Sequence, residues 1–254
     1  MKLTVLMENA PAGTFVHEHG LSIHMEYNGK NYLLDAGSSG KFAENATALK
    51  IDLSKVDAAV LSHGHYDHGD GLVGFFAENR TAPVYLRPDA LNPQYFKAGL
   101  IKKFIGVNPK LYADYEDRFT AVEGVYPLAE GLWLVPDDIA HEQSLVAETA
   151  EGLVVLNSCC HAGAGNIVKG ILEQFPGKKV RALIGGFHLM GMTGVNSLGV
   201  APGIAQNLAR WLTDELGVEK IYTGHCTGLP AYDLMKKERP QQFHTLNTGD
   251  VLVF

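Results

Sequence analysis

The stretch Ser62-His63-Gly64-His65-Tyr66-Asp67-His68 places three imidazoles and a carboxylate within six residues. Neutral imidazoles and carboxylates are the donors that zinc and similar divalent metals take in proteins. His63 and His65 are two positions apart after an apolar stretch, so an extended loop can direct both to one point. Asp67 and His68 are adjacent and begin the next turn, so we expect them to face a second point. The spacing predicts two neighbouring metal sites rather than one.

Three further histidines each follow an apolar stretch that we expect to be a strand. They are His161 after residues 153–156, His188 after 180–184 and His225 after 220–223. In open α/β sheets, ligands bind at the carboxyl ends of the parallel strands. We therefore expect these three histidines to converge on the edge that carries the first motif. The remaining histidines lack this context, and His24 and His244 fit packed or surface positions in strands; the others are His17, His19 and His141.

Around these loops the chain alternates apolar strands, glycine-containing loops and helices. Residues 2–7, 21–27 and 32–35 show the pattern of strands, and Asn28-Gly29 is a hairpin turn between the last two. Ser38 or Ser39 can cap a helix that runs toward Lys50. We expect further strands at 57–61, 153–157, 180–184 and 218–223, and helices near 70–79, 165–175 and 230–238. This alternation predicts an α/β fold.

The composition fits a folded α/β protein. The 254 residues are 46% hydrophobic and 19% charged, which excludes a disordered or fibrous chain. The net charge is −7 and no run of Lys and Arg forms a basic stripe, so we expect no nucleic-acid partner. No stretch fits a signal peptide or a membrane span, so we expect a cytoplasmic protein without a membrane partner. The 3 cysteines are too few for a disulfide framework.

Residues 87–120 differ from the rest of the chain because basic and aromatic residues alternate there. The basic residues are Lys97, Lys102, Lys103, Lys110 and Arg118, and the aromatic ones Phe96, Phe104, Tyr112 and Tyr115. Two interpretations stay open: a solvated helical excursion with buried aromatics, or a lid or substrate-approach insertion that contacts an anionic or aromatic substrate. No linker composition separates the halves of the chain, so we expect residues 1–254 to form a single domain.

Taken in order, these motifs resemble those of the metallo-β-lactamase-fold hydrolases. The resemblance lies in Leu34-Asp35-Ala36-Gly37, the 63–68 motif, His161 and Gly224-His225, and it spans nearly the whole chain. Further motifs are similar to the 7,8-dihydropterin-6-methyl-4-(β-D-ribofuranosyl)aminobenzene-5′-phosphate synthase-like branch. They are Asp137-Asp138-Ile139 with Glu142-Gln143-Ser144-Leu145, Cys160-His161-Ala162-Gly163 with Asn166-Ile167, Gly185-Gly186-Phe187-His188-Leu189, and Thr223-Gly224-His225-Cys226-Thr227-Gly228.

The resemblance implies a fold and a set of metal ligands. The implied fold is a four-layer αββα sandwich of two mixed sheets, with the metals at one edge. Carried over by position, the ligands are His63, His65 and His161 for the first metal, and Asp67, His68 and His225 for the second. Asp35 would support the metal loops through hydrogen bonds rather than ligate. The implied cofactor is zinc, as one or two ions, with manganese or iron as alternatives.

One position departs from the family pattern. Most members carry a bridging aspartate after the fourth strand, in a Gly-Asp step, where this chain has Gly185-Gly186-Phe187-His188. Without that carboxylate the site has one negative charge fewer, so the second metal can be weaker, absent or different from the first. His188 is then a candidate ligand or substrate-binding residue, and packing is the alternative.

The implied chemistry is attack by a metal-activated water. A metal ion lowers the pKa of bound water to roughly 7, and Asp67 could orient that water or take its proton; His188 is a second candidate catalytic residue. Gly163, Gly165 and Asn166 open a helix whose amides could hold a phosphate or oxyanion, although small residues at a helix start also serve packing. Cys160 and Cys226 adjoin predicted ligands. Each could be a thiol ligand or a nucleophile, and the alternative is a small buried residue.

We therefore expect a metal-dependent hydrolase or transferase that acts on an anionic small molecule, either phosphate-bearing or pterin-like. One alternative is iron-dependent oxygen or sulfur chemistry on the same fold. The H-x-H-x-D-H pattern, which lacks glutamate at the second position, argues against the di-iron oxygen-reducing branch. A non-catalytic metal or ligand sensor is the other alternative. A homodimer is compatible with the sequence.

Overall fold

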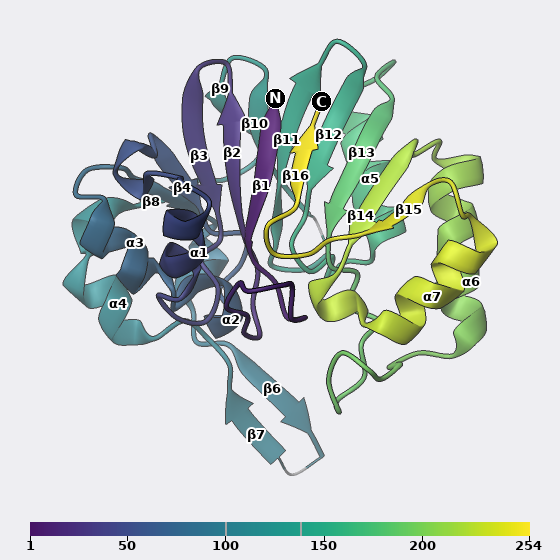
Figure 1. The fold of residues 1–254 in the computed structure, drawn as a ribbon, viewed down its shortest axis with the longest axis horizontal. Helices are drawn as coiled ribbons and strands as arrows, with labels where there is room; N and C mark the ends of the chain where they lie inside the picture. Colours follow the sequence, from purple (N-terminus) through teal and green to yellow (C-terminus); the bar gives the residue numbers. More distant parts are fainter. Residues whose placement is uncertain (100, 138) are drawn as a thin grey trace. The chain divides into compact units, whose positions relative to one another are not determined.

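The computed structural model describes residues 1–99, 101–137 and 139–254, and these form two compact units. Unit 1 comprises Met1–Gly124 and Asn247–Val253, and unit 2 comprises Val125–Leu246 and Phe254. Each unit contains one large seven-stranded sheet (Figure 1). Leu100 of the predicted insertion and Asp138 of one branch motif lie outside the described residues. The single-domain organisation stays a prediction.

The sheet of unit 1 has the strand order β16-β1-β2-β3-β4-β5-β8. Its strands are β1 Lys2–Met7, β2 Ser22–Tyr27, β3 Lys30–Leu34, β4 Ala58–Val60, β5 Val84–Leu86, β8 Phe119–Ala121 and β16 Val251–Val253. Strands β3, β4, β5 and β8 are parallel, and the others pair antiparallel. The predicted hairpin is confirmed: Asn28 and Gly29 have φ values of 49° and 75°, as a tight turn between β2 and β3 requires.

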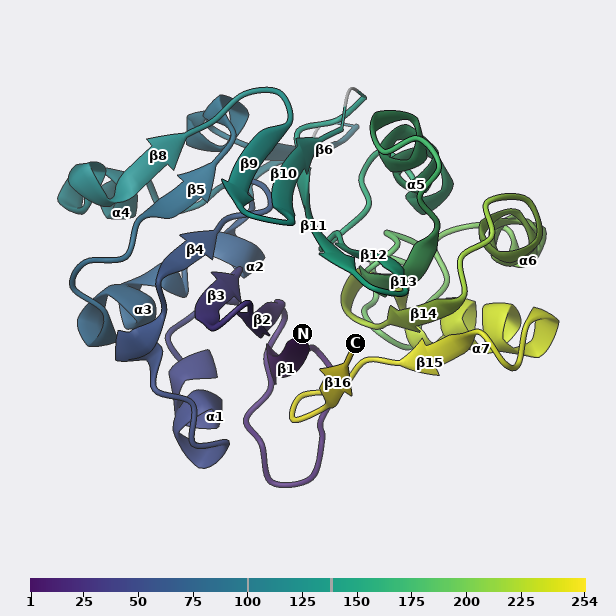
Figure 2. The ribbon, with the colours of Figure 1, turned by 90° about the horizontal axis from the view of Figure 1, so that it is seen from above.

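Helices cover one face of this sheet (Figure 2). They are α1 Phe42–Ala48, α2 Tyr66–Gly69, α3 Leu72–Glu78 and α4 Pro109–Asp114, with 3-10 turns at Leu53–Lys55, Pro88–Leu91 and Glu116–Arg118. Phe42 and Phe75 are fully buried in one apolar cluster with Leu33 of β3. The predicted cap of the first helix is wrong. The helix begins only at Phe42, and Ser39 instead donates its hydroxyl to Glu18 at 2.7 Å.

The segment 87–120 is only partly helical. Its middle forms a separate antiparallel hairpin of β6 Tyr95–Ala98 and β7 Ile101–Phe104, which projects beyond α2 (Figure 1). The expectation of a helical excursion is therefore wrong for this part, because the side chains alternate with the period of a strand. The expected helix and buried aromatic are found further on, in α4 with the mostly buried Tyr112. A lid function stays a prediction.

The sheet of unit 2 has the strand order β15-β14-β13-β12-β11-β10-β9. Its strands are β9 Tyr126–Ala129, β10 Leu132–Pro136, β11 Gln143–Thr149, β12 Gly152–Leu156, β13 Val180–Gly185, β14 Lys220–Thr223 and β15 Phe243–Thr245. Strands β12 to β15 are parallel, and β9 to β12 pair antiparallel. Its helices are α5 Ala164–Gln174, α6 Pro202–Arg210 and α7 Leu229–Glu238. The turn Trp211–Glu215 follows α6, and the turn His225–Thr227 precedes α7.

The helices of unit 2 bury an apolar cluster against one face of its sheet (Figure 2). Ile167, Val168 and Ile171 of α5 lie in this cluster at the spacing of a helix face. The predicted strands and helices from 57 to 238 are all present within a few residues of their expected bounds. Among the described residues, no helix has the length and hydropathy that a membrane span needs.

Candidate metal centre

The motif of unit 1 forms the loop between β4 and α2. His65 has extended backbone, with φ −90° and ψ 147°, and the short helix α2 begins at the next residue. His63 Nε2 lies 3.0 Å from His65 Nδ1, and the rings of His63 and His68 are 4.3 Å apart. Two nitrogens on one tetrahedral zinc ion, at bond lengths near 2.0–2.1 Å, are roughly 3.3 Å apart. The spacing of His63 and His65 therefore fits two ligands of one divalent ion.

Asp35 supports this loop through hydrogen bonds. It is fully buried, and its backbone has a φ of 55°, at the carboxyl end of β3. One carboxylate oxygen accepts from the Ser62 amide at 2.7 Å, and the other lies 2.7 Å from both Ser62 Oγ and His68 Nδ1. A carboxylate that accepts this hydrogen bond keeps the proton of His68 on Nδ1, so Nε2 is the nitrogen that a metal ion could bind. These are the contacts that the predicted supporting role of Asp35 requires.

Asp67 is buried beside two imidazoles. Its Oδ2 lies 3.5 Å from His68 Nε2 and 3.2 Å from His19 Nε2. His19 comes from the irregular segment before β2, where no strand pattern precedes it, so its context did not mark it as a candidate. A side chain on Gly20 would collide with the Asp67 carbonyl, since its Cβ would lie 2.5 Å from that oxygen. Glycine at this position therefore allows the His19 segment to approach Asp67.

The corresponding loop of unit 2 follows β12 and is held by Glu142. This residue is fully buried; its Oε1 accepts from the Cys159 amide at 2.7 Å and its Oε2 from the His161 amide at 3.0 Å. Asn157 Oδ1 accepts from the Cys160 amide at 2.8 Å, and Cys160 has a φ of 52°. Glu142 was part of a branch motif in the sequence, but no role was predicted for it.

Three histidine rings of unit 2 lie next to one another beside this loop. The ring of His161 lies 4.5 Å from that of His188 and 4.9 Å from that of His141. His188 has a φ of 53°, and its amide donates to Cys226 Sγ at 3.3 Å. The structure thus brings together the predicted residues His161 and His188. It adds His141, which lies two residues before β11 and which strand context did not mark as a ligand.

His225 lies in the 3-10 turn after β14, next to two thiols. A nitrogen of His225 and the Sγ atoms of Cys159 and Cys226 lie within 4.8 Å of one another, and all three residues are buried. Burial raises the pKa of the Cys226 thiol, but hydrogen bonds from Cys159 and His188 outweigh it and bring that pKa to about 6. Burial raises the pKa of the neighbouring Cys160 thiol. The two adjacent cysteines of the 159–160 pair therefore have different surroundings.

The start of α5 carries the residues predicted to bind an anion. Gly163 has a φ of 87° and precedes the helix, and the exposed Asn166 donates its amide to the Ala162 carbonyl at 2.8 Å. A Cβ on Gly165 would lie 2.2 Å from the Trp211 ring, so glycine at that position allows α5 to pack. Packing thus accounts for Gly165, and the anion-binding role of Gly163, Gly165 and Asn166 stays a prediction.

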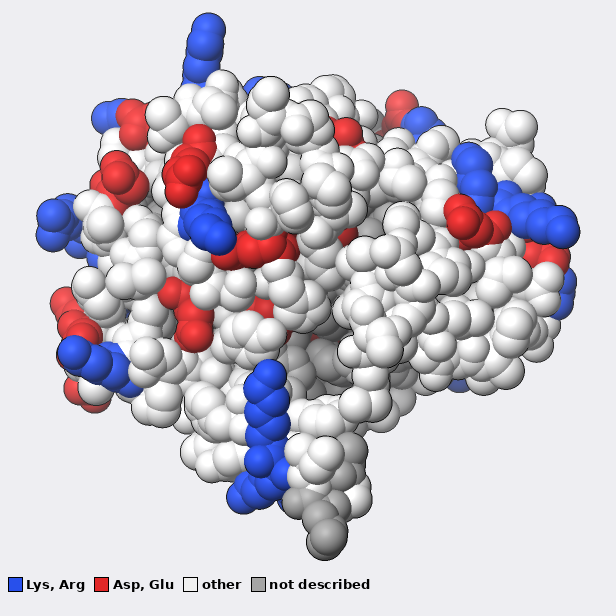
Figure 3. Space-filling view, turned by 60° about the horizontal axis from the view of Figure 1, so that its bottom comes forward, with Lys and Arg blue, Asp and Glu red and all other residues white. Residues whose placement is uncertain are grey.

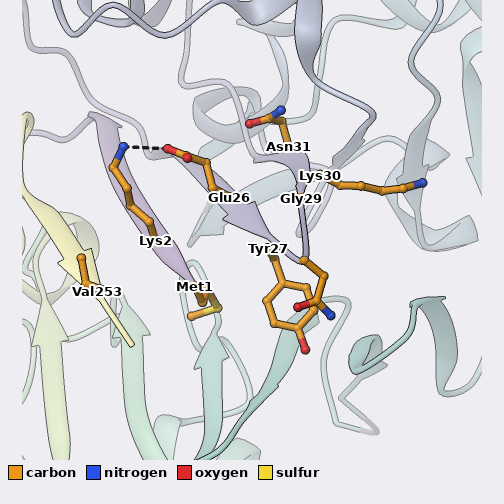
Figure 4. Close-up of a pocket in the computed structure, with 9 residues that line it drawn as sticks. Met1, Lys2, Glu26, Tyr27, Gly29, Lys30, Asn31 and Val253 are labelled. Carbon is orange, nitrogen blue, oxygen red and sulfur yellow. Dashed lines mark hydrogen bonds and ion pairs between the residues drawn. The ribbon is translucent and has the colours of Figure 1, made fainter.

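A surface pocket in unit 1 lies away from these loops. It has a volume of about 440 Å³ and is lined by residues around the β2–β3 turn, among them Lys2, Glu26 and Tyr27 (Figure 4). Lys2 and Glu26 form an ion pair of 2.7 Å across it. The turn is at the amino end of β3, whereas Asp35 follows its carboxyl end. This pocket is therefore separate from the metal-type donors of unit 1.

The family of the chain follows from comparison with known proteins. Residues 18–225 match the family model of the metallo-beta-lactamase superfamily. The chain belongs to this superfamily. Its α/β fold with two large mixed sheets, predicted from the sequence, is confirmed. Proteins of this superfamily usually bind divalent metals and are often hydrolases, and the imidazole, carboxylate and thiol donors described above fit such ions.

Individual relatives agree with this assignment. A 7,8-dihydropterin-6-methyl-4-(beta-D-ribofuranosyl)-aminobenzene-5′-phosphate synthase of Methanocaldococcus jannaschii is 29% identical, with 94% of this chain and 91% of that protein covered. A crystal structure of a metal-dependent hydrolase of the beta-lactamase superfamily is 27% identical, with a TM-score of 0.81 over 100% of this chain and 99% of that one. A diphosphatase of the PhnP family, 17% identical with a TM-score of 0.60 over 100% and 97% of the two chains, shares the fold.

Proposed function

We propose that this protein is a metal-dependent hydrolase or transferase acting on a phosphate-bearing or pterin-like small molecule. The observation that carries the proposal is the buried cluster of unit 1. There the ring nitrogens of His63 and His65 lie 3.0 Å apart, and Asp35 fixes the ring of His68. Packing alone does not require imidazole rings to be fixed by hydrogen bonds, whereas a metal site needs ligand rings in a fixed orientation. The substrate class is supported by the relative from Methanocaldococcus jannaschii, whose name describes the synthesis of a compound with a dihydropterin and a phosphate group.

The proposed ligands are those that the family pattern implies. They are His63, His65 and His161 for one ion, and Asp67, His68 and His225 for a second; zinc is the proposed metal. When bound, such an ion supplies a nucleophilic hydroxide at neutral pH and polarises the oxygen under attack. Asp67 would accept the proton of the attacking water. His19, 3.2 Å from the same carboxylate, would then hold Asp67 in place through its Nε2.

The hairpin β6–β7 is the proposed recognition element for an anionic substrate. It is joined directly to the metal loop: His65 pairs with Gly106, the Tyr66 amide donates to the Ile105 carbonyl at 2.9 Å, and the Val107 amide donates to the Gly64 carbonyl at 3.0 Å. The backbone that carries the predicted ligands therefore continues into the hairpin base. A contact made by the hairpin would be held at a fixed distance from His65.

The charges on the hairpin support an anionic ligand. Lys97 and Lys102 are directly opposite in the strand register and lie on one face with Tyr95 and Phe104. The Lys102 Nζ lies 3.9 Å over the Tyr95 ring, and basic side chains are visible on this hairpin at the bottom of the view (Figure 3). Like charges opposite each other destabilise a hairpin. A phosphate between the two ammonium groups would relieve this repulsion, and the aromatic rings would stack on a heterocycle.

Metal analysis and hydrolytic assays test the proposal. Purified protein is expected to contain stoichiometric transition metal, and His65→Ala is expected to lose metal together with phosphodiesterase, phosphatase or lactonase activity. His17→Ala, which alters an exposed histidine, is the matched control and should keep both. Metal-free protein as isolated, or a His65→Ala variant with unchanged activity on the whole substrate panel, would refute the proposal.

A paired variant tests the hairpin. Lys97→Gln/Lys102→Gln should raise KM for a phosphorylated substrate by roughly tenfold, about 1.4 kcal/mol of binding, while kcat changes little. Lys103→Gln removes a charge from the opposite face of the same hairpin and is the control. Equal KM changes in both variants would show that only the overall charge matters, and would exclude a specific contact.

A further inference from the structure

We propose that Cys159, His225 and Cys226 form a thiolate metal site in unit 2. This site would replace the carboxylate that the chain lacks at residues 185–188. The three ligand atoms lie within 4.8 Å of one another, and each side chain is buried, so one ion can reach them after small side-chain movements. The inference shares His225 with the proposed function and rests on it to that extent.

The missing carboxylate and the thiols occupy the same place in the fold. Gly185-Gly186 stands where most family members have a Gly-Asp step. A Cβ built on Gly186 would lie 2.5 Å from Cys226 Sγ and 2.9 Å from the Ser158 carbonyl. An aspartate at this position would therefore collide with the sulfur and with the backbone. The sulfur of Cys226 fills the space beside β13 from which that side chain would start.

The surroundings of Cys226 orient its sulfur. The His188 amide donates to Cys226 Sγ at 3.3 Å, and Cys226 Sγ lies 3.7 Å from the Cys159 carbonyl. The positive φ of His188, 53°, places its amide in this position. These two contacts hold the sulfur beside the ligand atoms of Cys159 and His225. The amides of both Cys159 and His188 are thus fixed by hydrogen bonds, Cys159 through Glu142.

The donor chemistry suits zinc. Two thiolates and one imidazole leave the fourth tetrahedral position open, as in zinc sites that take part in catalysis. Thiolates are soft ligands and prefer zinc over magnesium, calcium or manganese. Each thiol gives up its proton when the ion binds. Of the residues proposed for the second ion, this site uses only His225, so it is an alternative to ligation of His225 together with Asp67 and His68, and it would be selective for a thiophilic metal.

Cys160 provides a control within the same loop. It is as buried as Cys159, but its Sγ lies 3.9 Å from the Asn157 carbonyl, and the cluster of ligand atoms does not include it. If the cysteines were only small core residues, replacing Cys160 by serine would have the same spectroscopic effect as replacing Cys159 or Cys226. If the inference is right, the three substitutions differ.

The test is cobalt substitution followed by absorption spectroscopy. The full chain is stripped with a chelator and reconstituted with Co²⁺, whose thiolate complexes show a sulfur-to-metal charge-transfer band in the near ultraviolet. We expect the band in the wild type and in Cys160→Ser, a weaker band in Cys159→Ser and in Cys226→Ser, and its loss in the Cys159→Ser/Cys226→Ser variant. A wild type that binds cobalt stoichiometrically without this band, or a double variant that retains it, would overturn the inference.

X-ray absorption of the wild-type zinc protein covers the case in which the double variant does not fold. Sulfur neighbours at about 2.3 Å from zinc support the site, and a shell of nitrogen and oxygen alone refutes it. The two proposals fail separately. A hydrolase whose metals have only nitrogen and oxygen ligands keeps the proposed function and loses the thiolate site, whereas sulfur ligation without turnover on any substrate does the reverse.

Discussion

Asp35 in unit 1 and Glu142 in unit 2 are both fully buried beside a loop that carries histidines, but they bind different parts of their loops. Asp35 contacts side chains, the Ser62 hydroxyl and the His68 ring, in addition to one amide. The Glu142 carboxylate accepts from two backbone amides, those of Cys159 and His161. The first carboxylate therefore sets the tautomer and orientation of the His68 ring, while these two contacts of the second set the path of the chain.

This difference matters for the donors that each loop presents. In unit 1 the imidazole of His68 is fixed before any ion arrives. In unit 2 the rings of His141, His161 and His188 lie against one another at tilted angles, and the sulfur of Cys226 has the His188 amide and the Cys159 carbonyl as partners. Contacts between rings tolerate small rotations, whereas a short charged hydrogen bond does not. The hydrogen bond to Asp35 therefore holds the His68 ring in one orientation.

The largest expected effect is that of Asp35→Ala. The substitution leaves the Ser62 amide and the His68 ring without their shared acceptor in a fully buried position, so we expect a loss of about 3–5 kcal/mol in the free energy of unfolding. Urea denaturation measures it. Asp52→Ala is the control, because Asp52 is exposed and caps one 3-10 turn, worth about 1 kcal/mol. Similar losses in the two variants would show that Asp35 is only a turn residue.

Glu142→Gln should have a smaller effect. Glutamine keeps one carbonyl oxygen, so one of the two amide hydrogen bonds is lost, at about 1.5–3 kcal/mol. Hydrogen exchange should quicken at the amides of Cys159 and His161, and urea denaturation gives the change in stability. Glu148→Gln alters a part-exposed carboxylate on β11 and should change stability by less than about 1 kcal/mol. Unchanged exchange at both amides would contradict the role given to Glu142.

The sequence was informative where a ligand follows its own strand. His63 and His65 lie in one loop, so their spacing alone predicted that their rings approach each other, and their nearest nitrogens are 3.0 Å apart. His161, His188 and His225 each follow a parallel strand, and the rule for carboxyl ends of parallel strands marked them as candidates. In these cases the local pattern already contains the information that places the side chain.

The sequence was not informative where tertiary pairing places the residue. His141 precedes β11, but β11 runs antiparallel to β12, with Leu145 opposite Leu156, so the start of one strand lies beside the end of the other. The rule that ligands lie at the carboxyl ends of parallel strands does not mark a residue before the start of an antiparallel strand. His19 reaches Asp67 from an irregular segment, and only the close approach at Gly20 allows it. The hairpin 95–104 was missed because its alternating lysines and aromatics were interpreted as a helix.

The smallest expected effect concerns two histidines outside the clusters, His24 on β2 of unit 1 and His244 on β15 of unit 2. Burial lowers the pKa of both below the usual 6.5, and for His24 the nearby Lys2 lowers it further while Glu26 and Asn31 raise it. One ring nitrogen of each has no hydrogen-bond partner, Nδ1 of His24 and Nε2 of His244, but His24 is only 4% exposed whereas His244 is half-buried and stacks on Tyr222. The two units therefore differ in their sensitivity to acid at these positions.

The sign of the pH effect follows from the lowered pKa values. Above pH 6.5 both histidines are neutral in the folded and the unfolded chain, so they add no pH dependence. As the pH falls through 6.5 toward the folded-state pKa, the unfolded chain binds more protons, and stability falls by at most about 1.4 kcal/mol per pH unit for each histidine. His24→Gln should therefore reduce the loss of stability between pH 7.5 and about 5.5, measured by urea denaturation, and His244→Gln should reduce it less. An equal reduction in both variants would show that the burial of His24 does not set its proton affinity.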